Sequence, residues 1–434
     1  MRAHRGAAAT AGVFLLSAFA LSCNDDSSPA LLEPADDAGA PALQVVTTWH
    51  VATWGSDGNP GTSANPFRSV QKAVNAARPG DTILVHGGTY SGVVTIDGRS
   101  NPAAAPIVIR AAGDGLPVLT ANFPRLSCGG SSPTSDRTVQ IVRGSDYWTF
   151  DGLHVVNGIW IAGENAGSIS DADVRNRNLP GRNSYDPAAA RNALPGLGVD
   201  AADGIRILNT RVTRRGIHAT AARFGEIRNS WIWDIDCGVG AAIWLNTFSD
   251  LWTIAGNHVH HVDASDKHFM SEGIRLGRAS SYAAITGNTV EDLGGLGRGI
   301  ATDVNASWNT IRGNRARRTE IGFSQQAGGW GNKWQANVSE SNRNFGFAVY
   351  TKSAQPSRPD DSTPAHLDVS CNQSFNERLD LRIGGVRDSR FQSNRFATVK
   401  LSDALGSYWG AEGNTWNGSS KPPSTNPSIV TTGC

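Results

Sequence analysis

A short strand pattern, Gly-Ile-x-Leu, recurs along this chain and places one side chain of each copy on an outer face. The two apolar side chains must point into a core, so the residue between them and the residue two places later point outward. The clearest copy, at 273–276, reads Gly-Ile-Arg-Leu. In chain order the outward residues are Arg206, His218, Trp244, Arg275, Ala301, Ser324, Ala348 and Arg382, followed two places later by Thr220, Asn246, Gly277, Asp303, Gln326 and Tyr350.

If these strands stack as coils, outward residues of neighbouring coils lie about 4.8 Å apart. His218, Trp244, Arg275 and Asp303 then form one column. Aromatic rings stack on the apolar faces of sugars, and arginine binds a carboxylate or sulfate through two parallel hydrogen bonds. We interpret the column as a groove for a polysaccharide rather than as a merely solvated face. The predicted substrate-binding residues are Trp244, Arg206, Asn246 and Tyr350.

The same groups can support β-elimination on a uronic-acid polymer. That reaction needs a neutralised sugar carboxylate, a base for the C5 proton and an acid for the leaving oxygen. We predict Lys267 or His218 as the base, with His268 as a weaker alternative, and Arg275 and Arg298 as the groups that neutralise the carboxylate. The predicted ligands of a calcium ion are Glu272, Asp303 and Asp266.

Two other polar clusters are weaker candidates. Asp234 and Asp236 could be the paired carboxylates of a glycoside hydrolase, but we interpret them as part of a turn after a strand. His258 and His260 share one strand face, whereas His261 is expected to point the opposite way. Metal sites need converging ligands, so we interpret these histidines as polar residues at a turn.

The elements that position these side chains follow from a repeat. A second phrase, Ile-x-Gly-Asn-x-Val, follows the strand pattern, and its asparagines recur at intervals of 20 to 35 residues. Such a period indicates a solenoid, here of about 10–12 coils, and stacked turn asparagines can hydrogen-bond along its axis. The aligned asparagines are Asn257, Asn288, Asn314, Asn337, Asn372, Asn394 and Asn414.

Three polar insertions interrupt the period, at about 164–202, 262–272 and 354–365. Long loops on a regular solenoid usually lie on the binding face. The 262–272 insertion carries the predicted base Lys267, so we consider it the best candidate for a binding-face loop.

The start of the body combines a helix with a strand. Phe67, Val70, Val74 and Ala77 fall at helical spacing, which predicts a short amphipathic helix over 66–77. Residues 80–85 read Gly-Asp-Thr-Ile-Leu-Val, a predicted strand over 82–85, and 87–90 read Gly-Gly-Thr-Tyr. This order resembles the opening of secreted pectate-lyase-like β-helix proteins, in which a small helix plugs the first coil. The exposed end of a solenoid needs such a cover.

The resemblance, over about 49–420, implies an all-β fold: a single-stranded right-handed parallel β-helix with an N-terminal capping helix. It favours a polysaccharide lyase. The chain lacks the Ala-Asp-Gly-x-x-x-Lys segment of calcium-dependent β-helix lyases, the Gly-His-Gly segment of galacturonases and the Tyr-Gly-x-Asp-Pro-His segment of alginate epimerases. Catalytic residues are therefore not carried over. The alternatives to a lyase are a non-catalytic glycan-binding surface lipoprotein and a glycoside hydrolase of the same fold.

The N-terminus resembles a bacterial lipoprotein signal. Arg2 and Arg5 precede an apolar stretch that ends in Ala-Leu-Ser-Cys at Cys23, the predicted lipidation site. Ordinary secretion is the alternative. The sequence thus predicts a signal peptide over 1–23, a flexible tether over 24–46 and the β-helix over 47–434.

Four cysteines remain in the body, Cys128, Cys237, Cys371 and Cys434. In an oxidising compartment they allow two disulfides in three connectivities, among which the sequence does not choose. The net charge of +1 gives no global field for nucleic acid or a membrane surface, so membrane contact is expected only through the lipid anchor. We expect an exported monomer that engages an anionic polysaccharide.

Overall fold

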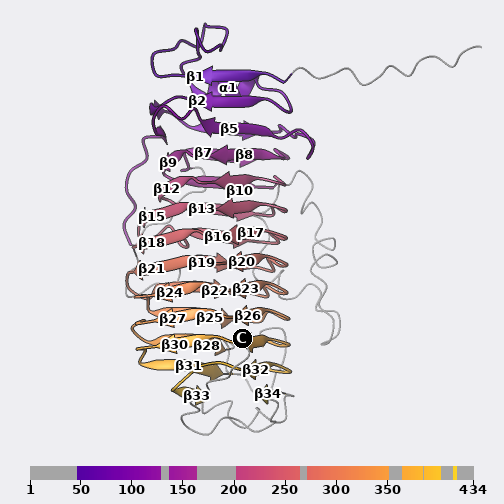
Figure 1. Ribbon diagram of the computed structural model, residues 1–434, viewed down its shortest axis with the longest axis vertical. Helices are drawn as coiled ribbons and strands as arrows, with labels where there is room; N and C mark the ends of the chain where they lie inside the picture. Colours follow the sequence, from indigo (N-terminus) through magenta and orange to yellow (C-terminus); the bar gives the residue numbers. More distant parts are fainter. Residues whose placement is uncertain are drawn as a thin grey trace, which may run out of the picture. The chain divides into compact units, whose positions relative to one another are not determined.

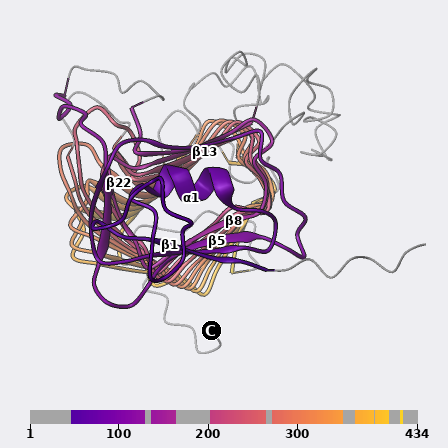
Figure 2. The ribbon, with the colours of Figure 1, turned by 90° about the horizontal axis from the view of Figure 1, so that it is seen from above.

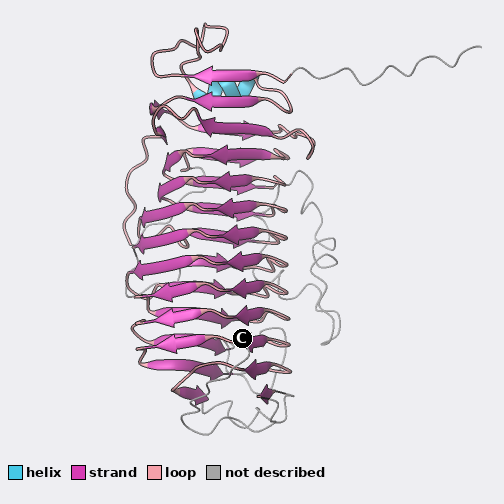
Figure 3. Ribbon diagram, in the orientation of Figure 1, coloured by secondary structure: helices cyan, strands magenta, loops and turns pink. Residues whose placement is uncertain are grey.

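The computed structural model describes residues 46–128, 136–163, 202–263, 271–350, 364–384, 386–401 and 414–417. Within them the chain winds as a parallel β-helix, and each coil adds strands to three parallel sheets, which we term A, B and C (Figure 1). These sheets have 13, 10 and 11 strands. The predicted all-β solenoid and its number of coils are confirmed. Strands account for nearly all regular structure in the described part (Figure 3).

Sheet A consists of β1 (Thr48–Val51), β2 (Thr82–Val85), β5 (Ile107–Ala111), β8 (Trp148–Asp151), β11 (Arg206–Leu208), β14 (Glu226–Arg228), β17 (Thr253–Ala255), β20 (Ala284–Thr286), β23 (Thr310–Arg312), β26 (Lys333–Gln335), β29 (Asp368–Ser370), β32 (Arg390–Gln392) and β34 (Thr415–Trp416). Sheet B consists of β3 (Gly88–Ser91), β6 (Pro117–Thr120), β9 (His154–Val156), β12 (Arg211–Arg214), β15 (Trp231–Ile235), β18 (His258–Val262), β21 (Thr289–Leu293), β24 (Arg315–Arg317), β27 (Val338–Glu340) and β30 (Gln373–Phe375). Sheet C consists of β4 (Val94–Asp97), β7 (Val139–Val142), β10 (Ile159–Ala162), β13 (Ile217–Thr220), β16 (Ile243–Asn246), β19 (Glu272–Leu276), β22 (Arg298–Thr302), β25 (Ile321–Gln326), β28 (Phe345–Tyr350), β31 (Leu379–Gly384) and β33 (Val399–Leu401).

The core is built from side chains that stack in register from coil to coil. In sheet C, Ile243 pairs with Ile274, which pairs with Ile300, and all three are fully buried. Further along the same column Phe323 stacks on Phe347 with ring centres 4.7 Å apart. Full burial of such a side chain stabilises the fold by about 1.5–3 kcal/mol. The Gly-Ile-x-Leu pattern therefore marks inward-facing positions, as the alternation predicts.

A buried asparagine ladder fixes the turn between sheets A and B. The backbone N–H and the side-chain amide of Asn288 both donate to Oδ1 of Asn314, each at 2.9 Å. The same arrangement repeats from Asn257 as far as Asn394, and every member is buried. The prediction of this ladder is confirmed except for Asn414. That side chain accepts from the backbone N–H of Ser389 and belongs to a second ladder at the entry to sheet A.

The capping helix α1 (Val70–Ala76) lies over the middle of the coils when the stack is viewed end-on (Figure 2). Its buried Val70, Ala73 and Val74 cover the apolar interior. The helix begins later than the predicted residue 66 because Ser69 caps it, accepting from the backbone N–H of Lys72. Phe67 instead pairs with Val51 as a β-bridge, so the helical spacing of Phe67 is coincidental. Among the described residues no helix is long and apolar enough to span a membrane.

The aspartate of the Gly-Asp-Thr-Ile segment ties the first coil together. Asp81 is buried and accepts from the backbone N–H groups of Thr47 and Arg78 and from the indole N–H of Trp49, at 2.8–2.9 Å. A carboxylate with three donors is well suited to this buried position. The motif therefore has a structural role at the start of the winding.

The asparagine ladder should be a large source of stability. We expect Asn314→Ala to lower the free energy of unfolding by about 1–3 kcal/mol for each buried donor of Asn288 that loses its acceptor. Denaturant unfolding measures this. Thr286→Ala, on the outer face of the same coil as Asn288, is the control and should change stability little. Equal stability of the two variants would contradict a structural role for the ladder.

Candidate functional site

The outer face of sheet C carries the predicted column. His218 is the strand partner of Trp244, and Trp244 that of Arg275, on β13, β16 and β19. Ala301, Ser324, Ala348 and Arg382 continue the column. Arg206 does not belong to it, because it lies on β11 in sheet A and pairs with Glu226. That part of the prediction is wrong, since strands of different sheets share the same apolar alternation.

Asp303 lies in the column next to Arg275 rather than in the same one. Arg275 donates from Nη2 to Oδ2 of Asp303 at 2.7 Å, and Nε2 of Gln326 donates to the same oxygen at 3.2 Å. The Tyr350 hydroxyl donates to Oε1 of Gln326 at 2.7 Å. A hydrogen-bonded chain thus runs across four coils of the outer face.

A second ion pair lies on the other side of Arg275. Glu272 and Arg298 are paired positions of β19 and β22, and Nη2 of Arg298 is 2.7 Å from Oε1 of Glu272. Nη1 of Arg275 is 3.9 Å from the other carboxylate oxygen. Glu272 is 0% exposed and Arg298 only 2%. Buried charges of this kind persist only when they are paired, and here two arginines balance two carboxylates.

The described residues do not fit the predicted calcium site. Oδ1 of Asp303 accepts from the backbone N–H of Val304, its other oxygen accepts from Arg275, and Glu272 is buried against Arg298. No cluster of three His, Cys, Asp or Glu side chains in the described part of the chain could hold a metal ion. The third predicted ligand, Asp266, lies outside the described residues, as do Lys267, His268 and Cys23.

His218 is built into the fold rather than presented to a substrate. Nδ1 of His218 is 3.3 Å from the Arg137 guanidinium, and Nε2 is 2.7 Å from the carbonyl oxygen of Ala241. Burial, together with the positive charge of Arg137, lowers the pKa of His218 to about 3. The imidazole therefore stays neutral but is a weak base with both nitrogens engaged. The geometry does not favour His218 as the base.

Trp244 and Tyr350 are half-buried aromatic residues of this face, and the half-buried Trp160 pairs in register with His218 on its other side. The Arg275 guanidinium lies 5.1 Å from the centre of the Trp244 ring, and the edge of that ring system meets His218. Arg382 lies 5.6 Å from the centre of the Tyr350 ring. Burial raises the pKa of the Tyr350 phenol, so it is a hydrogen-bond donor at neutral pH. Asn246, the fourth predicted binding residue, is also half-buried, on β16.

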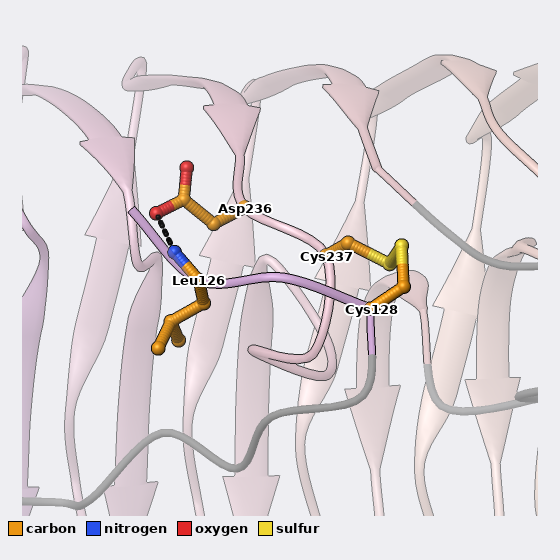
Figure 4. The surroundings of a disulfide bond; sticks show 4 residues. All are labelled: Leu126, Cys128, Asp236 and Cys237. Carbon is orange, nitrogen blue, oxygen red and sulfur yellow. Dashed lines mark hydrogen bonds between the residues drawn. A yellow bond between two sulfur atoms is a disulfide. The ribbon is translucent and has the colours of Figure 1, made fainter. Parts of the chain in front are cut away.

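The paired aspartates hold a long excursion of the chain in place. Leu126 donates its backbone N–H to Oδ2 of Asp236 at 3.1 Å, and Cys128 and Cys237 form a disulfide just beyond (Figure 4). Arg125 forms ion pairs with both Asp234 and Asp236. The Cys128–Cys237 disulfide decides part of the cysteine connectivity. Cys371 is also disulfide-bonded. The aspartates are thus attached to neighbouring chain rather than poised across a scissile bond.

The histidine cluster on sheet B differs from its prediction. His261 has a positive φ of 53° at a bulge, and its Nδ1 lies 2.6 Å from Nδ1 of His260. Because the bulge breaks the alternation of the strand, His261 is exposed on the outer side, and the expectation that it points the opposite way is wrong. The sequence reasoning also missed the neighbouring tryptophans: Trp233 stacks on His260, and Trp231 meets His258 edge to face.

Comparison with known proteins shows which families and solved structures are similar to this chain. The family model described as Pel9A-like, right handed beta helix region, matches residues 49–190. Over these residues the chain is similar to the right-handed β-helix region of that family. Pectate lyase PEL9 of Emericella nidulans is 34% identical over 118 residues, which cover 25% of this chain and 28% of that protein. Pectate lyase L of Dickeya chrysanthemi is 30% identical over 145 residues, covering 30% and 32%.

This β-helix chain therefore aligns with only about a third or less of each relative's length. Two solved structures share its fold at a TM-score of 0.50. One is XylC in complex with xylose, 12% identical and covering 85% of this chain and 86% of that one. The other is a glycoside hydrolase, 11% identical and covering 85% and 96%. At this identity the likeness concerns the fold alone.

The buried ion pairs should make Glu272 important for folding. We expect Glu272→Ala to lower the free energy of unfolding by about 3–5 kcal/mol, because it leaves Arg298 buried without its carboxylate. Arg206→Ala, which removes an exposed partner of Glu226, is the control and should cost about 1 kcal/mol or less. Chemical denaturation of both variants measures the difference. A small effect at Glu272 would mean that the pair is solvated.

The stability should fall in acid partly through His218. In the unfolded chain the His218 imidazole has an ordinary pKa of 6.5 and binds a proton near that pH. In the folded chain the pKa is about 3, so the same imidazole binds a proton only near pH 3. The stabilisation is therefore complete above pH 6.5 and is lost as the pH falls toward 3, by up to about 1.4 kcal/mol per pH unit. His218→Asn should flatten this part of the pH profile of unfolding. An identical slope in variant and wild type would contradict the prediction.

Proposed function

We propose that the protein is a polysaccharide lyase that cleaves a uronic-acid-containing polymer by β-elimination. The similarity of a quarter to a third of the chain to two pectate lyases supports this reaction class. We assign the reaction to the outer face of sheet C because Arg275, Arg298 and Trp244 lie close together there. This proximity is the observation that supports the proposed site. A ring and two guanidinium groups can hold a uronate by its apolar face and its carboxylate.

The proposed reaction assigns one role to each group. Arg275 and Arg298 neutralise the uronate carboxylate, which acidifies the C5 proton. The Lys267 amine removes that proton; the electron pair forms the C4–C5 double bond, the bond from C4 to the leaving oxygen breaks, and a solvent water protonates the leaving oxygen. Trp244, Asn246 and Tyr350 bind the polymer chain. Because Glu272 and Asp303 are paired with arginines, no step is routed through calcium.

A non-catalytic glycan-binding protein is the second candidate. Two observations favour it: the charges of Arg275 and Arg298 are already balanced by carboxylates, and His218 is unsuited as a base. In that case the same face would bind the polymer without cleaving it. A glycoside hydrolase is supported less, because Asp234 and Asp236 hold the excursion around Leu126.

We also propose that the protein acts outside the cytoplasm. The Cys128–Cys237 disulfide is consistent with an extracellular protein, since such bonds persist in oxidising compartments. An N-terminal lipid at Cys23 would tether a monomer to the cell envelope and keep it near its polymeric substrate.

Incubation of the full chain with polygalacturonate, alginate, hyaluronan or chondroitin tests the lyase proposal, with and without a chelator. Formation of unsaturated uronate ends is followed by ultraviolet absorbance. We expect Lys267→Ala to lower kcat by about 10²–10⁴-fold as the base is lost, and Arg275→Lys to lower it by about 10²–10³-fold. Arg390→Ala, an exposed arginine of sheet A, is the control and should keep wild-type activity.

Two results would contradict the proposal. New reducing ends without unsaturation would identify a hydrolase. Polymer binding with no product on any substrate would identify the glycan-binding alternative for those polymers. Thermal unfolding of each variant separates loss of a chemical group from loss of the fold.

A further inference from the structure

Four bulky apolar side chains form a row along the corner where the chain enters sheet A. Phe224, Leu251, Tyr282 and Trp308 each stand two residues before a strand, namely β14, β17, β20 and β23. The last three of these strands lie one below another in Figure 1. The four residues belong to neighbouring coils, so the row extends over about 14 Å at a coil spacing of about 4.8 Å.

Backbone hydrogen bonds hold the row in register. The N–H of Phe224 donates to the carbonyl oxygen of Asp250 at 3.1 Å, and that of Leu251 to Ser281 at 2.9 Å. The N–H of Tyr282 donates to Ser307 at 3.2 Å. Each acceptor is the residue directly before the next member of the row. The side chains therefore leave equivalent points of successive coils.

These positions are unfavourable for the residues that occupy them. The φ angles of the four are 57°, 62°, 58° and 58°, in the left-handed region that bulky side chains rarely adopt. Glycine occupies the same turn position in the flanking coils, as Gly204 and Gly331. The four side chains are also 50%, 44%, 44% and 37% exposed. Half-exposed side chains add little to the core, so folding alone does not account for the row.

The flanking glycines make room for rings at both ends. A Cβ on Gly331 would lie 2.0 Å from Cε3 of Trp308, and a Cβ on Gly204 would lie 2.3 Å from Cδ1 of Tyr147. Each ring therefore lies against the backbone of the neighbouring coil. Tyr147 thus adds a supported aromatic ring beyond Gly204, and Trp308 is the supported ring at the other end of the row.

The adjacent face of sheet A carries small side chains in the middle and charged side chains at both ends; at one end Arg206 and Arg228 both pair with Glu226. Over β11, β14, β17, β20, β23 and β26, the outward positions of the central strands hold Thr and Ala. Four of the outward side chains are cations and one is an anion, a net charge of +3 against +1 for the whole chain. The charged residues are Arg206, Glu226, Arg228, Arg312 and Lys333.

We propose that this row and the adjacent face of sheet A bind an anionic polysaccharide, at a site separate from the outer face of sheet C. Rings stack on the apolar faces of sugars, threonine hydroxyls hydrogen-bond to sugar hydroxyls, and the cations at either end bind carboxylates or sulfates. Arg312 and Lys333 form no ion pair with a described residue and supply this charge at one end. The site holds the polymer whether or not sheet C cleaves it.

Replacement by glycine tests the proposal without endangering the fold. In the full chain, Tyr282→Gly combined with Trp308→Gly removes two rings and relieves two left-handed strains, so the melting temperature should stay the same or rise. We expect the Kd for polygalacturonate, measured by affinity electrophoresis, to rise at least tenfold. Arg312→Ala with Lys333→Ala should weaken binding and reduce its salt dependence. Trp231→Ala, which removes a more exposed tryptophan on sheet B, is the control and should bind as wild type.

Four results would overturn the proposal. They are an unchanged Kd in the glycine double variant, equal affinity of the wild type for neutral dextran, a lowered melting temperature that shows a packing role, and a wild-type dimer in sedimentation that the glycine variant abolishes. The last result would assign the row to a second copy of the chain. Affinity electrophoresis measures binding of the polymer and not its cleavage. Failure of the lyase proposal would therefore appear as absence of unsaturated product in the activity assay and would not change the measured Kd.

Discussion

In the described part of the chain, each inner coil hydrogen-bonds to the coils on either side of it, and this register is the constraint on which the rest of the structure depends. The strands supply most of these bonds, but strands alone could slide along one another. The buried asparagines prevent this at the turn between sheets A and B, because each Oδ1 accepts two N–H groups from the preceding coil. A shift of one residue would leave several buried polar groups without partners. The ladder thus keeps the three sheets stacked in a single register.

The same register creates columns of outward side chains, and these columns carry the candidate chemistry. Arg275 lies 3.9 Å from Glu272 of its own strand, and the winding of the next coil brings Asp303 within 2.7 Å of it. Two columns of a solenoid therefore act as a single polar surface assembled from residues far apart in sequence. The buried, compensated charges give this surface a defined geometry, in which a uronate carboxylate would enter an existing network rather than meet isolated cations.

Departures from the regular strand have their own consequences. At His261 a bulge turns a side chain outward that strict alternation would bury. At the entry to sheet A, left-handed turn residues direct Phe224, Leu251 and Tyr282 into solvent. The Cys128–Cys237 bond spans 109 residues and attaches an excursion of the chain to a distant coil. Because the strands are so regular, the features that distinguish one coil from the next lie mainly in turns and bulges.

The sequence by itself determined the solenoid, because apolar alternation, the asparagine period and the Gly-Asp-Thr-Ile segment are local patterns that report on the repeat unit. It also determined that His218, Trp244 and Arg275 stack, since they occupy the same place in successive units. Only the tertiary structure decided that Arg206 lies in another sheet, that His218 is enclosed by Arg137 and Ala241, and that Glu272 is neutralised by Arg298. Strands of all three sheets share one alternation pattern, so sheet membership cannot be read from it. Burial and charge pairing depend on neighbours that only the winding of the chain brings together.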